Sequence, residues 1–569
     1  MGKKSGSKLY IIIAVVSITA AILLGLIMIL DPLPKGKESS GEFSAENAYS
    51  YLENIAKEPH SVFDTIQLGD VRQYIIDTID SLGLTSNPVR HNDVSQLNAK
   101  TDKEETVEIN NIYAEIPGTS GRNILLMAHY DSSPYKLKYG EVTEGSHGAA
   151  DDGYGVVTIL EIMRLLQSSD KPLVNGIKFV FTDSEETGLN GAEAITGEYS
   201  QYLTDVNLVV NIEARGNHGP LYMFQTSAEN TNIINLYSKV DKPFSFSVAA
   251  EVYKYLPCDT DLTPFLDAGY NCINFSTLND LRSYHTQFDT LENTSKGTLQ
   301  AYGSQVYPLV TQYVYDKTYS NDNSFESNSD SVFFTLLPGL LVHYPVGFSW
   351  IIIIFAVLCA ILISILAAKR KLLNMINVIK SLFLWFAFLL VAAIVGYLSI
   401  WLPCVVTGTA FHLTFMPYVP FDRGFLILSA VVISVAAIGS VRLFMKLKCN
   451  LTDVLSGGLF LNMIFLLLFA FVLHGGTYLF LWPILLTTLY MACEVFLTGD
   501  KKWHTVMKHS VKALLIIFTV LIYFLLIYSL FLALTIGALA VMTLLMSIPL
   551  SILAPYMFIR VQNESLSIK

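Results

Sequence analysis

Hydrophobic residues are concentrated at the start of the chain and in its C-terminal part. An apolar run covers residues 9–30, a polar segment follows to about residue 346, and long apolar runs then return. A helix needs about 20 apolar residues to cross the ~30 Å hydrocarbon core of a bilayer. The first run follows three lysines, has no small-residue cleavage site and is longer than a signal-peptide core. We therefore expect residues 1–30 to be a cytoplasmic tip and an uncleaved transmembrane anchor.

Seven further runs are long enough to span a membrane. They are 348–368, 381–403, 424–445, 454–474, 478–496, 513–532 and 538–559, and the last two are split at residues 535–537. The apolar stretch 331–344 is broken by Pro338-Gly339, so we expect it to lie in the membrane interface. The pattern thus predicts an interfacial segment and about seven transmembrane helices over 331–569.

Basic residues alternate along these predicted spans. Lys and Arg concentrate on the cytoplasmic side of membrane proteins, and here they flank every second connection. The clusters are Lys3/Lys4/Lys8, Lys369-Arg370-Lys371, Arg442/Lys446/Lys448, Lys501/Lys502/Lys508/Lys512 and Arg560/Lys569. We therefore expect both termini in the cytoplasm and the polar segment outside it, at the cell surface or in an organelle lumen.

The polar segment, expected to form one domain over 31–330, alternates helical and strand patterns. Apolar residues recur at helical spacing in 46–55, 70–82 and 156–166. Strand patterns occupy 111–115, 123–127, 176–181 and 206–212. The segment 123–127 is a continuous apolar run suited to a buried sheet, and 176–181 and 206–212 are again apolar strands. This alternation predicts an α/β sandwich with a mostly parallel central sheet and helices on both faces.

The composition excludes several classes of protein. Hydrophobic residues make up 52% of the 569 residues and charged residues only 15%, with a mean hydropathy of +0.46. A disordered chain and a wholly soluble enzyme are therefore excluded. A net charge of −11 argues against nucleic acid as a partner. The six cysteines form no CxxC pair, and whether Cys258 and Cys272 of the polar domain are bonded stays open.

Imidazole and carboxylate side chains follow the predicted strands, open a helix or lie in a turn-rich stretch. They are His129, Asp151, Glu185, Glu186, Glu213 and His285. Taken singly, each has a structural explanation as a turn histidine, a helix cap or a solvated acidic turn. Taken together, they gather where α/β sheets carry their chemistry, and they suit Zn²⁺, which accepts nitrogen and oxygen ligands. Because one catalytic zinc needs three protein ligands, the surplus suggests two Zn²⁺ sharing a carboxylate.

The surrounding motifs resemble a known family. His-x-Asp, Gly-Ala-x-Asp-Asp-Gly, Ser-Glu-Glu-x-Gly, Asn-x-Glu-Ala-Arg-Gly and Tyr-His-Thr-x-x-Asp-Thr occur in that order. They are similar to the five sequence blocks of the di-zinc exopeptidase family, which contains zinc aminopeptidases, glutamate carboxypeptidases and glutaminyl cyclases. The resemblance covers residues 45–318. The layout, with one span before the domain and many after it, is similar to the vacuolar-membrane and endoplasmic-reticulum metallopeptidases.

The resemblance implies a set of metal ligands. His129 and Glu213 would hold one zinc, Glu186 and His285 would hold the other, and Asp151 would bridge both. Glu213 stands where many soluble members have Asp, which adds a methylene to that ligand.

The resemblance also implies roles for residues that do not bind metal. Glu185 takes the position of the general base, and Tyr284 matches a phenol that donates to the developing oxyanion. Asp131 matches a carboxylate that orients the ligand imidazole of His129. Asp259 and Asp261 either shape the active site or cap a helix.

These expectations define the function that the sequence favours. It is a membrane-anchored di-zinc metallopeptidase, of the aminopeptidase type, whose partners are peptide substrates and the lipid bilayer. A glutaminyl cyclase and a non-catalytic, peptidase-like membrane scaffold are the alternatives. The sequence leaves the oligomeric state, the natural substrate and the role of the C-terminal helices open.

Overall fold

The computed structural model describes residues 3–37, 41–138, 141–411, 419, 421–498 and 501–558. Internal contacts divide the chain into two compact units. One comprises residues 29–345, and the other comprises residues 1–28 together with 346–569.

The unit of residues 29–345 is built on a seven-stranded mixed sheet with the strand order β1-β4-β8-β5-β9-β11-β10. These strands are β1 Asn87–Arg90, β4 Asn110–Ile116, β5 Asn123–His129, β8 Gly176–Thr182, β9 Val206–Ala214, β10 Tyr222–Thr226 and β11 Cys272–Thr277. The central four, β8-β5-β9-β11, run parallel, while β4 and β10 pair antiparallel with β8 and β11, and β1 pairs antiparallel with β4. The centre therefore matches the predicted parallel sheet, and the antiparallel pairings are confined to its two edges.

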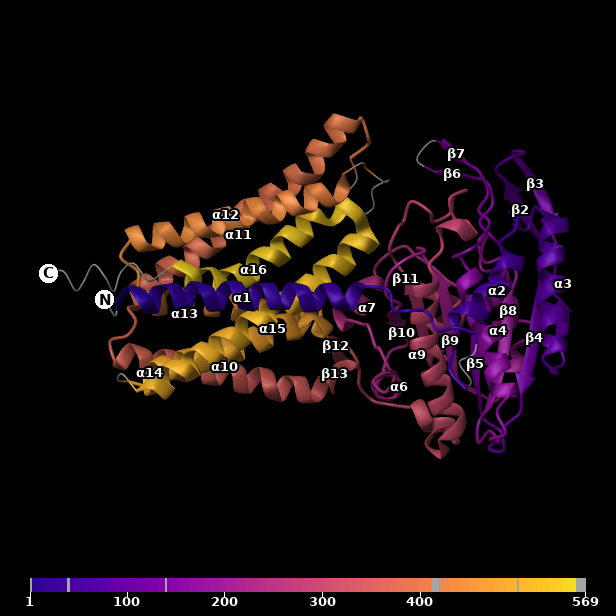
Figure 1. Ribbon diagram of the computed structural model, residues 1–569, viewed down its shortest axis with the longest axis horizontal. Helices are drawn as coiled ribbons and strands as arrows, with labels where there is room; N and C mark the ends of the chain where they lie inside the picture. The colour runs from indigo at the N-terminus through magenta and orange to yellow at the C-terminus, as the bar shows by residue number, and fades with distance from the viewer. Residues whose placement is uncertain are drawn as a thin grey trace. The chain divides into compact units, whose positions relative to one another are not determined.

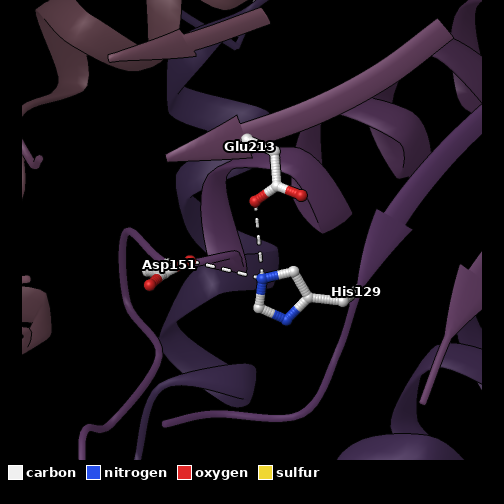
Figure 2. A group of neighbouring side chains, drawn as sticks. All are labelled: His129, Asp151 and Glu213. Carbon is white, nitrogen blue, oxygen red and sulfur yellow. Dashed lines mark hydrogen bonds and ion pairs between the residues drawn. The ribbon is translucent and has the colours of Figure 1, made fainter. Parts of the chain in front are cut away.

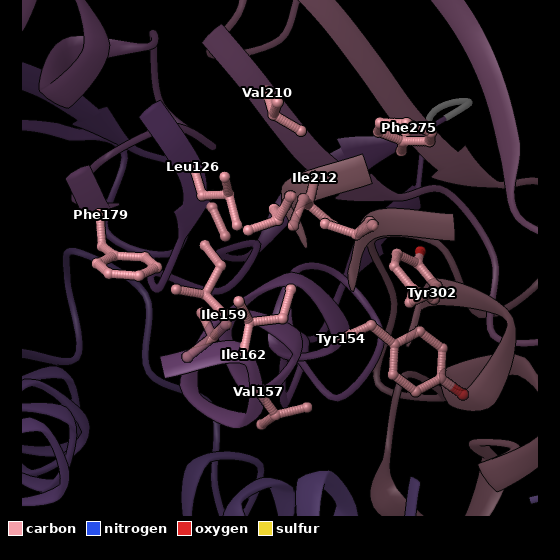
Figure 3. Close-up of a cluster of buried hydrophobic side chains, with 14 of the residues drawn as sticks. Leu126, Tyr154, Val157, Ile159, Ile162, Phe179, Val210, Ile212, Phe275 and Tyr302 are labelled. Carbon is pink, nitrogen blue, oxygen red and sulfur yellow. The ribbon is translucent and has the colours of Figure 1, made fainter. Parts of the chain in front are cut away.

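Helices cover both faces of the sheet, as the sequence pattern predicts. On one face, Leu126 and Ile212 pack with Ile159 and with Tyr302 in the main core (Figure 3). The helices that contribute most residues to this core are α2 Ala45–Ile55, α3 Thr65–Ser81, α4 Gly153–Gln167, α6 Thr231–Tyr237 and α9 Lys296–Tyr315. Successive strand residues point to opposite faces, so Met127 packs in a second cluster. That cluster includes residues of α5 Asn190–Thr196 and α8 Thr263–Asp267.

Shorter elements complete this unit. They are β2 Val94–Asn98 with β3 Lys103–Val107, β6 Lys136–Lys138 with β7 Glu141–Thr143, and α7 Ser247–Tyr253. Single 3₁₀ turns occupy Ser200–Leu203, Leu291–Asn293, Lys317–Tyr319 and Asp322–Phe325.

The apolar stretch 331–344 differs from its predicted form. It folds into a hairpin of β12 Ser331–Leu337 and β13 Leu340–Pro345, which turns at Pro338-Gly339 and belongs to the unit of residues 29–345. Phe333 enters the main core, and Phe334 forms a backbone bridge with Phe246. The Pro-Gly break seen in the sequence is therefore a hairpin turn, because the flanking apolar residues are used for packing within this unit.

In its described residues, the second unit consists of helices and the loops that connect them. It contains α1 Lys3–Ile29, α10 Val346–Lys369, α11 Met375–Thr407, α12 Asp422–Lys446, α13 Leu451–Val472, α14 Tyr478–Phe496, α15 Lys502–Leu534 and α16 Leu539–Phe558 (Figure 1). A 3₁₀ turn, His474–Gly476, precedes α14.

Seven helical stretches in the described residues are long and apolar enough to cross a membrane. The last stretch, Lys502–Tyr556, has 55 residues, or roughly 80 Å at 1.5 Å per residue, which is far more than one crossing needs. The 3₁₀ turn Thr535–Ala538 divides it into α15 and α16 at the predicted position, and these two helices pack on each other. With the last stretch divided, the described residues contain eight apolar helices, at the positions of the eight runs expected to span a membrane. Their orientation stays a prediction, and Ile559, Arg560 and Lys569 lie outside the described residues.

Candidate active site

The candidate residues lie at the carboxyl edge of the four parallel strands. His129 is the last residue of β5, and Glu213 lies at the end of β9. Glu185 and Glu186 follow β8. Since His129 pairs in register with Thr182 at the end of β8, these strands end at the same level. The parallel pairing therefore brings residues that are far apart in the sequence to one edge of the sheet.

The first group of side chains is His129, Asp151 and Glu213 (Figure 2). The Nε2 atom of His129 lies 3.2 Å from Oδ1 of Asp151 and 3.6 Å from Oε2 of Glu213. All three residues are buried. Asp151 reaches this position from the loop before α4, whose N-cap is the next residue, Asp152.

The second group is Asp151, Glu186 and His285. The Nε2 atom of His285 lies 3.2 Å from Oδ2 of Asp151 and 3.2 Å from Oε1 of Glu186. Asp151 thus directs one carboxylate oxygen to each histidine. The structure brings together all five residues that the resemblance implies as ligands, in the two implied groups.

The chemistry of this donor set fits divalent zinc. In each group the potential ligand atoms lie within 4.8 Å of one another, and two imidazole nitrogens with three carboxylates are ligands that Zn²⁺ prefers. Burial raises the pKa of Glu185, beside these groups, well above its usual range, and the charges of Glu213 and Glu186 raise it further. Bound cations would relieve this crowding of negative charge.

The pKa of His129 is also shifted by the negative charges around it. Burial lowers the pKa of its imidazole, but the charge of Glu185 and hydrogen bonds to Asp131 and Asp151 outweigh burial and raise the pKa well above 6.5. The carboxylates near Nε2 of this imidazole therefore favour a positive charge next to them. A metal cation supplies such a charge without a proton.

Asp131 orients two parts of the site. Its backbone carbonyl accepts a hydrogen bond from Nδ1 of His129 at 2.9 Å, while its carboxylate lies 3.5 Å from the same atom. The carboxylate accepts hydrogen bonds from the backbone N–H groups of Glu185 and Glu186 at 3.0 and 3.3 Å. The side chain therefore positions the loop that carries Glu185 and Glu186, and the main-chain carbonyl helps to orient the imidazole.

Asp289 positions the loop that carries Asp151, a role that the sequence analysis missed. Its carboxylate accepts hydrogen bonds from the backbone N–H groups of Ala150 at 2.8 Å and Asp151 at 3.2 Å, and from Ser146 Oγ at 3.1 Å. Burial and the charge of Asp151 raise its pKa to about 7. The motif Tyr-His-Thr-x-x-Asp-Thr contained this residue, but only the fold shows what it contacts.

Asn211 holds Glu213 within β9. Its Nδ2 donates to Oε1 of Glu213 at 3.0 Å, which leaves Oε2 directed at His129. Three residues further on, a Cβ added at Gly216 would lie 2.1 Å from the backbone oxygen of Asn279. The glycine of the Asn-x-Glu-Ala-Arg-Gly motif is therefore required by the close approach of these two segments.

Tyr284 lies beside the second group. Burial and the charge of Asp151 raise the pKa of its phenol well above 10, and the guanidinium of Arg215 opposes this shift. The hydroxyl therefore keeps its proton at neutral pH, as a hydrogen-bond donor must.

The two aspartates of the neighbouring loop have different environments. Asp261 is fully buried, its carboxylate accepts a hydrogen bond from Thr182 Oγ1, and burial raises its pKa to about 7. Asp259 is exposed and contacts Thr263 Oγ1. Asp261 is thus held against the end of β8, while Asp259 lies on the surface. Cys258 on the same loop is a free thiol, as is Cys272.

The family comparison decides the identity of this domain. The model of peptidase family M28 matches residues 111–310. This range contains all seven residues predicted from the sequence as ligands or catalytic groups. The chain contains a peptidase family M28 domain. The family resemblance inferred from the motifs is confirmed.

The relatives of the M28 domain include membrane proteins. The chain is 26% identical over 323 residues to endoplasmic reticulum metallopeptidase 1 of Mus musculus, covering 54% of this chain and 34% of the mouse protein. It is 27% identical over 362 residues to the vacuolar membrane protease of Kluyveromyces lactis, covering 60% of this chain and 38% of the yeast protein. The matches thus span little more than a third of these relatives.

Among solved structures, the M28 domain is similar to Porphyromonas gingivalis glutaminyl cyclase. The sequence identity is 22% and the TM-score is 0.39, and the match covers 48% of this chain and 99% of that protein.

The contacts of Asp289 generate a prediction about metal binding by the M28 domain. Asp289→Asn replaces one accepting oxygen by an amide, so one N–H of the Asp151 loop loses its partner. We expect zinc affinity to fall by about 10- to 100-fold, the usual cost of removing such a supporting contact. Zinc titration against a competing chelator measures this. Asp259→Asn, an exposed change on another loop, is the control, and equal affinities in both variants would contradict the assigned role.

Proposed function

We propose that this protein is a membrane-anchored di-zinc metallopeptidase that removes residues from the N-termini of peptides. The observation that supports it best is the pair of ligand groups that share Asp151, with Glu185 adjacent to the ligand Glu186. Two complete groups favour hydrolysis over the cyclisation reaction and over a non-catalytic scaffold. His129 and Glu213 would hold one ion, Glu186 and His285 would hold the other, and Asp151 would contribute a carboxylate oxygen to each.

The chemistry is that of metal-assisted peptide hydrolysis. Zinc ions, when bound, supply the Lewis acidity that polarises a peptide carbonyl and acidifies a water molecule. The carboxylate of Glu185 accepts the proton of the attacking water and passes it to the leaving amine. The hydroxyl of Tyr284 donates a hydrogen bond to the oxygen on which negative charge develops.

The concentration of negative charge argues for an N-terminal substrate. Glu185, Glu213 and the buried Asp261 are close enough to interact electrostatically, and such a group of carboxyl side chains suits the free ammonium group of a peptide N-terminus. That contact would place the first peptide bond beside the base, because a bound amine fixes the position of its own carbonyl. An internal peptide bond has no such anchor.

The location is proposed from the charge pattern. Basic residues flank alternate connections between the apolar helices, so both termini lie in the cytoplasm and the M28 domain lies on the opposite side. The domain boundaries proposed from the sequence are 1–30, 31–330 and 331–569, and the hairpin β12–β13 extends the middle domain to about residue 345.

The role of Glu185 is tested by its conversion to glutamine. Glu185→Gln keeps the shape of the side chain but cannot accept a proton, so we expect kcat to fall by about 10²- to 10⁴-fold. Zinc content per chain should stay at the wild-type value, because Glu185 is a base and not a ligand. Glu193→Gln on the exposed surface of α5 is the control. Activity within threefold of wild type would refute the assignment.

Blocking the substrate amine tests the exopeptidase assignment. Acetylation removes the positive charge and the lone pair of the N-terminus, so kcat/KM for a matched peptide should fall to a small fraction of its value. Mass spectrometry of the products from free and N-acetylated peptides measures both the rate and the bond that is cut. Efficient cleavage in the middle of the acetylated peptide would contradict the aminopeptidase assignment, although the protein would still be a metallopeptidase.

The orientation is tested with cysteine labelling. Asn323→Cys adds an exposed thiol to the M28 domain, and Lys369→Cys adds one at the end of α10. On intact cells, an impermeant thiol reagent should increase labelling over wild type for the first variant only, whereas permeabilised cells should show both. The opposite pattern would place the M28 domain in the cytoplasm.

A further inference from the structure

The segment that ends β9 leads from the first ligand group towards the second. Glu213 is a member of the first group, and Arg215 and Asn217 follow it at alternate positions. The backbone N–H of Arg215 donates to the carbonyl of Thr277 at 3.0 Å and to Ser276 Oγ at 3.1 Å. The segment therefore stays paired with the end of β11, which fixes the point from which the Arg215 side chain extends.

Both side chains reach the turn that carries His285. The Nδ2 atom of Asn217 donates to Ser283 Oγ at 3.0 Å. The guanidinium carbon of Arg215 lies 5.5 Å from the centroid of the Tyr284 ring, within the ~6 Å at which a cation is attracted to an aromatic face. The segment of residues 215–217 thus contacts two consecutive residues of the turn, 283 and 284.

The ring of Tyr284 is in turn stacked on a ligand. Its centroid lies 3.6 Å from that of the His285 imidazole, with the planes inclined by 26°. His285 has a φ of +56°, a left-handed conformation that residues other than glycine seldom adopt. Neighbouring contacts must stabilise such a conformation, and those of Tyr284 and Ser283 lie directly beside it.

We propose that Arg215 is a positioning residue for the phenol of Tyr284. The guanidinium holds the aromatic ring in place, so that the hydroxyl stays where it can donate to the carbonyl oxygen in the transition state. This inference rests on the proposed function, in which Tyr284 makes that hydrogen bond. Arg215 acts through Tyr284 and contacts neither substrate nor metal in this role.

Substitutions of Arg215 in the full-length, zinc-loaded protein test this role. Arg215→Met keeps the length of the side chain but removes its charge, and we expect kcat on an N-terminally free peptide to fall about tenfold with little change in KM. Arg215→Lys keeps a cation that can approach the ring, so it should recover most of the lost rate. Zinc content per chain and the unfolding temperature should stay close to wild type in both variants.

A double-mutant cycle distinguishes positioning from a direct role. Tyr284→Phe keeps the ring and removes the hydroxyl, so the contact of Arg215 with the ring remains but has no donor to position. Arg215→Met should therefore cost no further rate in the Tyr284→Phe background. Arg282→Met removes an exposed arginine two residues before Tyr284, and this control should leave kcat unchanged in both backgrounds.

Three results would overturn the inference. If the rate losses of the two single variants multiply in the double variant, Arg215 acts independently of the hydroxyl. If Arg215→Met loses zinc, Arg215 belongs to the metal site instead. Failure of Arg215→Lys to recover activity would exclude the attraction of a cation to the ring. An inactive wild-type protein would overturn the proposed function itself, whereas an active wild type with one of these results overturns only the role of Arg215.

Discussion

The crowding of carboxylates around Asp151 is the constraint on which the rest of this site depends. Asp151 contacts both histidines, and Glu186 and Glu213 approach from either side. Negative charges this close cannot all persist in a buried site without compensating positive charge. Divalent cations would supply that compensation, which would link metal binding to the local fold. In the proposed peptidase, the same ions would neutralise these carboxylates and activate the substrate.

A surrounding set of hydrogen bonds prevents the ligands from moving apart. Asp131 holds the Glu185–Glu186 loop, Asp289 holds the Asp151 loop, and Asn211 holds Glu213. Two of the three use a carboxylate that accepts two backbone N–H groups, which fixes a loop more firmly than a single bond. The ligands therefore keep their positions through the backbone, and the site is preorganised for its metal ions.

Much of this architecture could be predicted because the sequence carries strong local patterns. The central strands β5, β8 and β9 are mostly apolar and buried, and each carries or leads into imidazole or carboxylate side chains near its carboxyl end. Asp289 and Asn211 gave no such indication, since an aspartate in a turn and an asparagine in a strand have many possible partners. The hairpin β12–β13 was assigned to the interface because apolar composition does not reveal that Phe333 packs in the domain core. Contacts between residues distant in the sequence decide all three cases.

The glutamate at position 213 shows how the fold adapts to a changed ligand. A glutamate has one methylene more than an aspartate, and the extra rotatable bond would let its carboxylate occupy several positions. Asn211 restricts this freedom by donating to Oε1, so that Oε2 alone faces His129. Both residues lie on the same face of β9, two positions apart, and the strand therefore supplies the ligand and its restraint together. The longer side chain thus directs a single carboxylate oxygen towards His129.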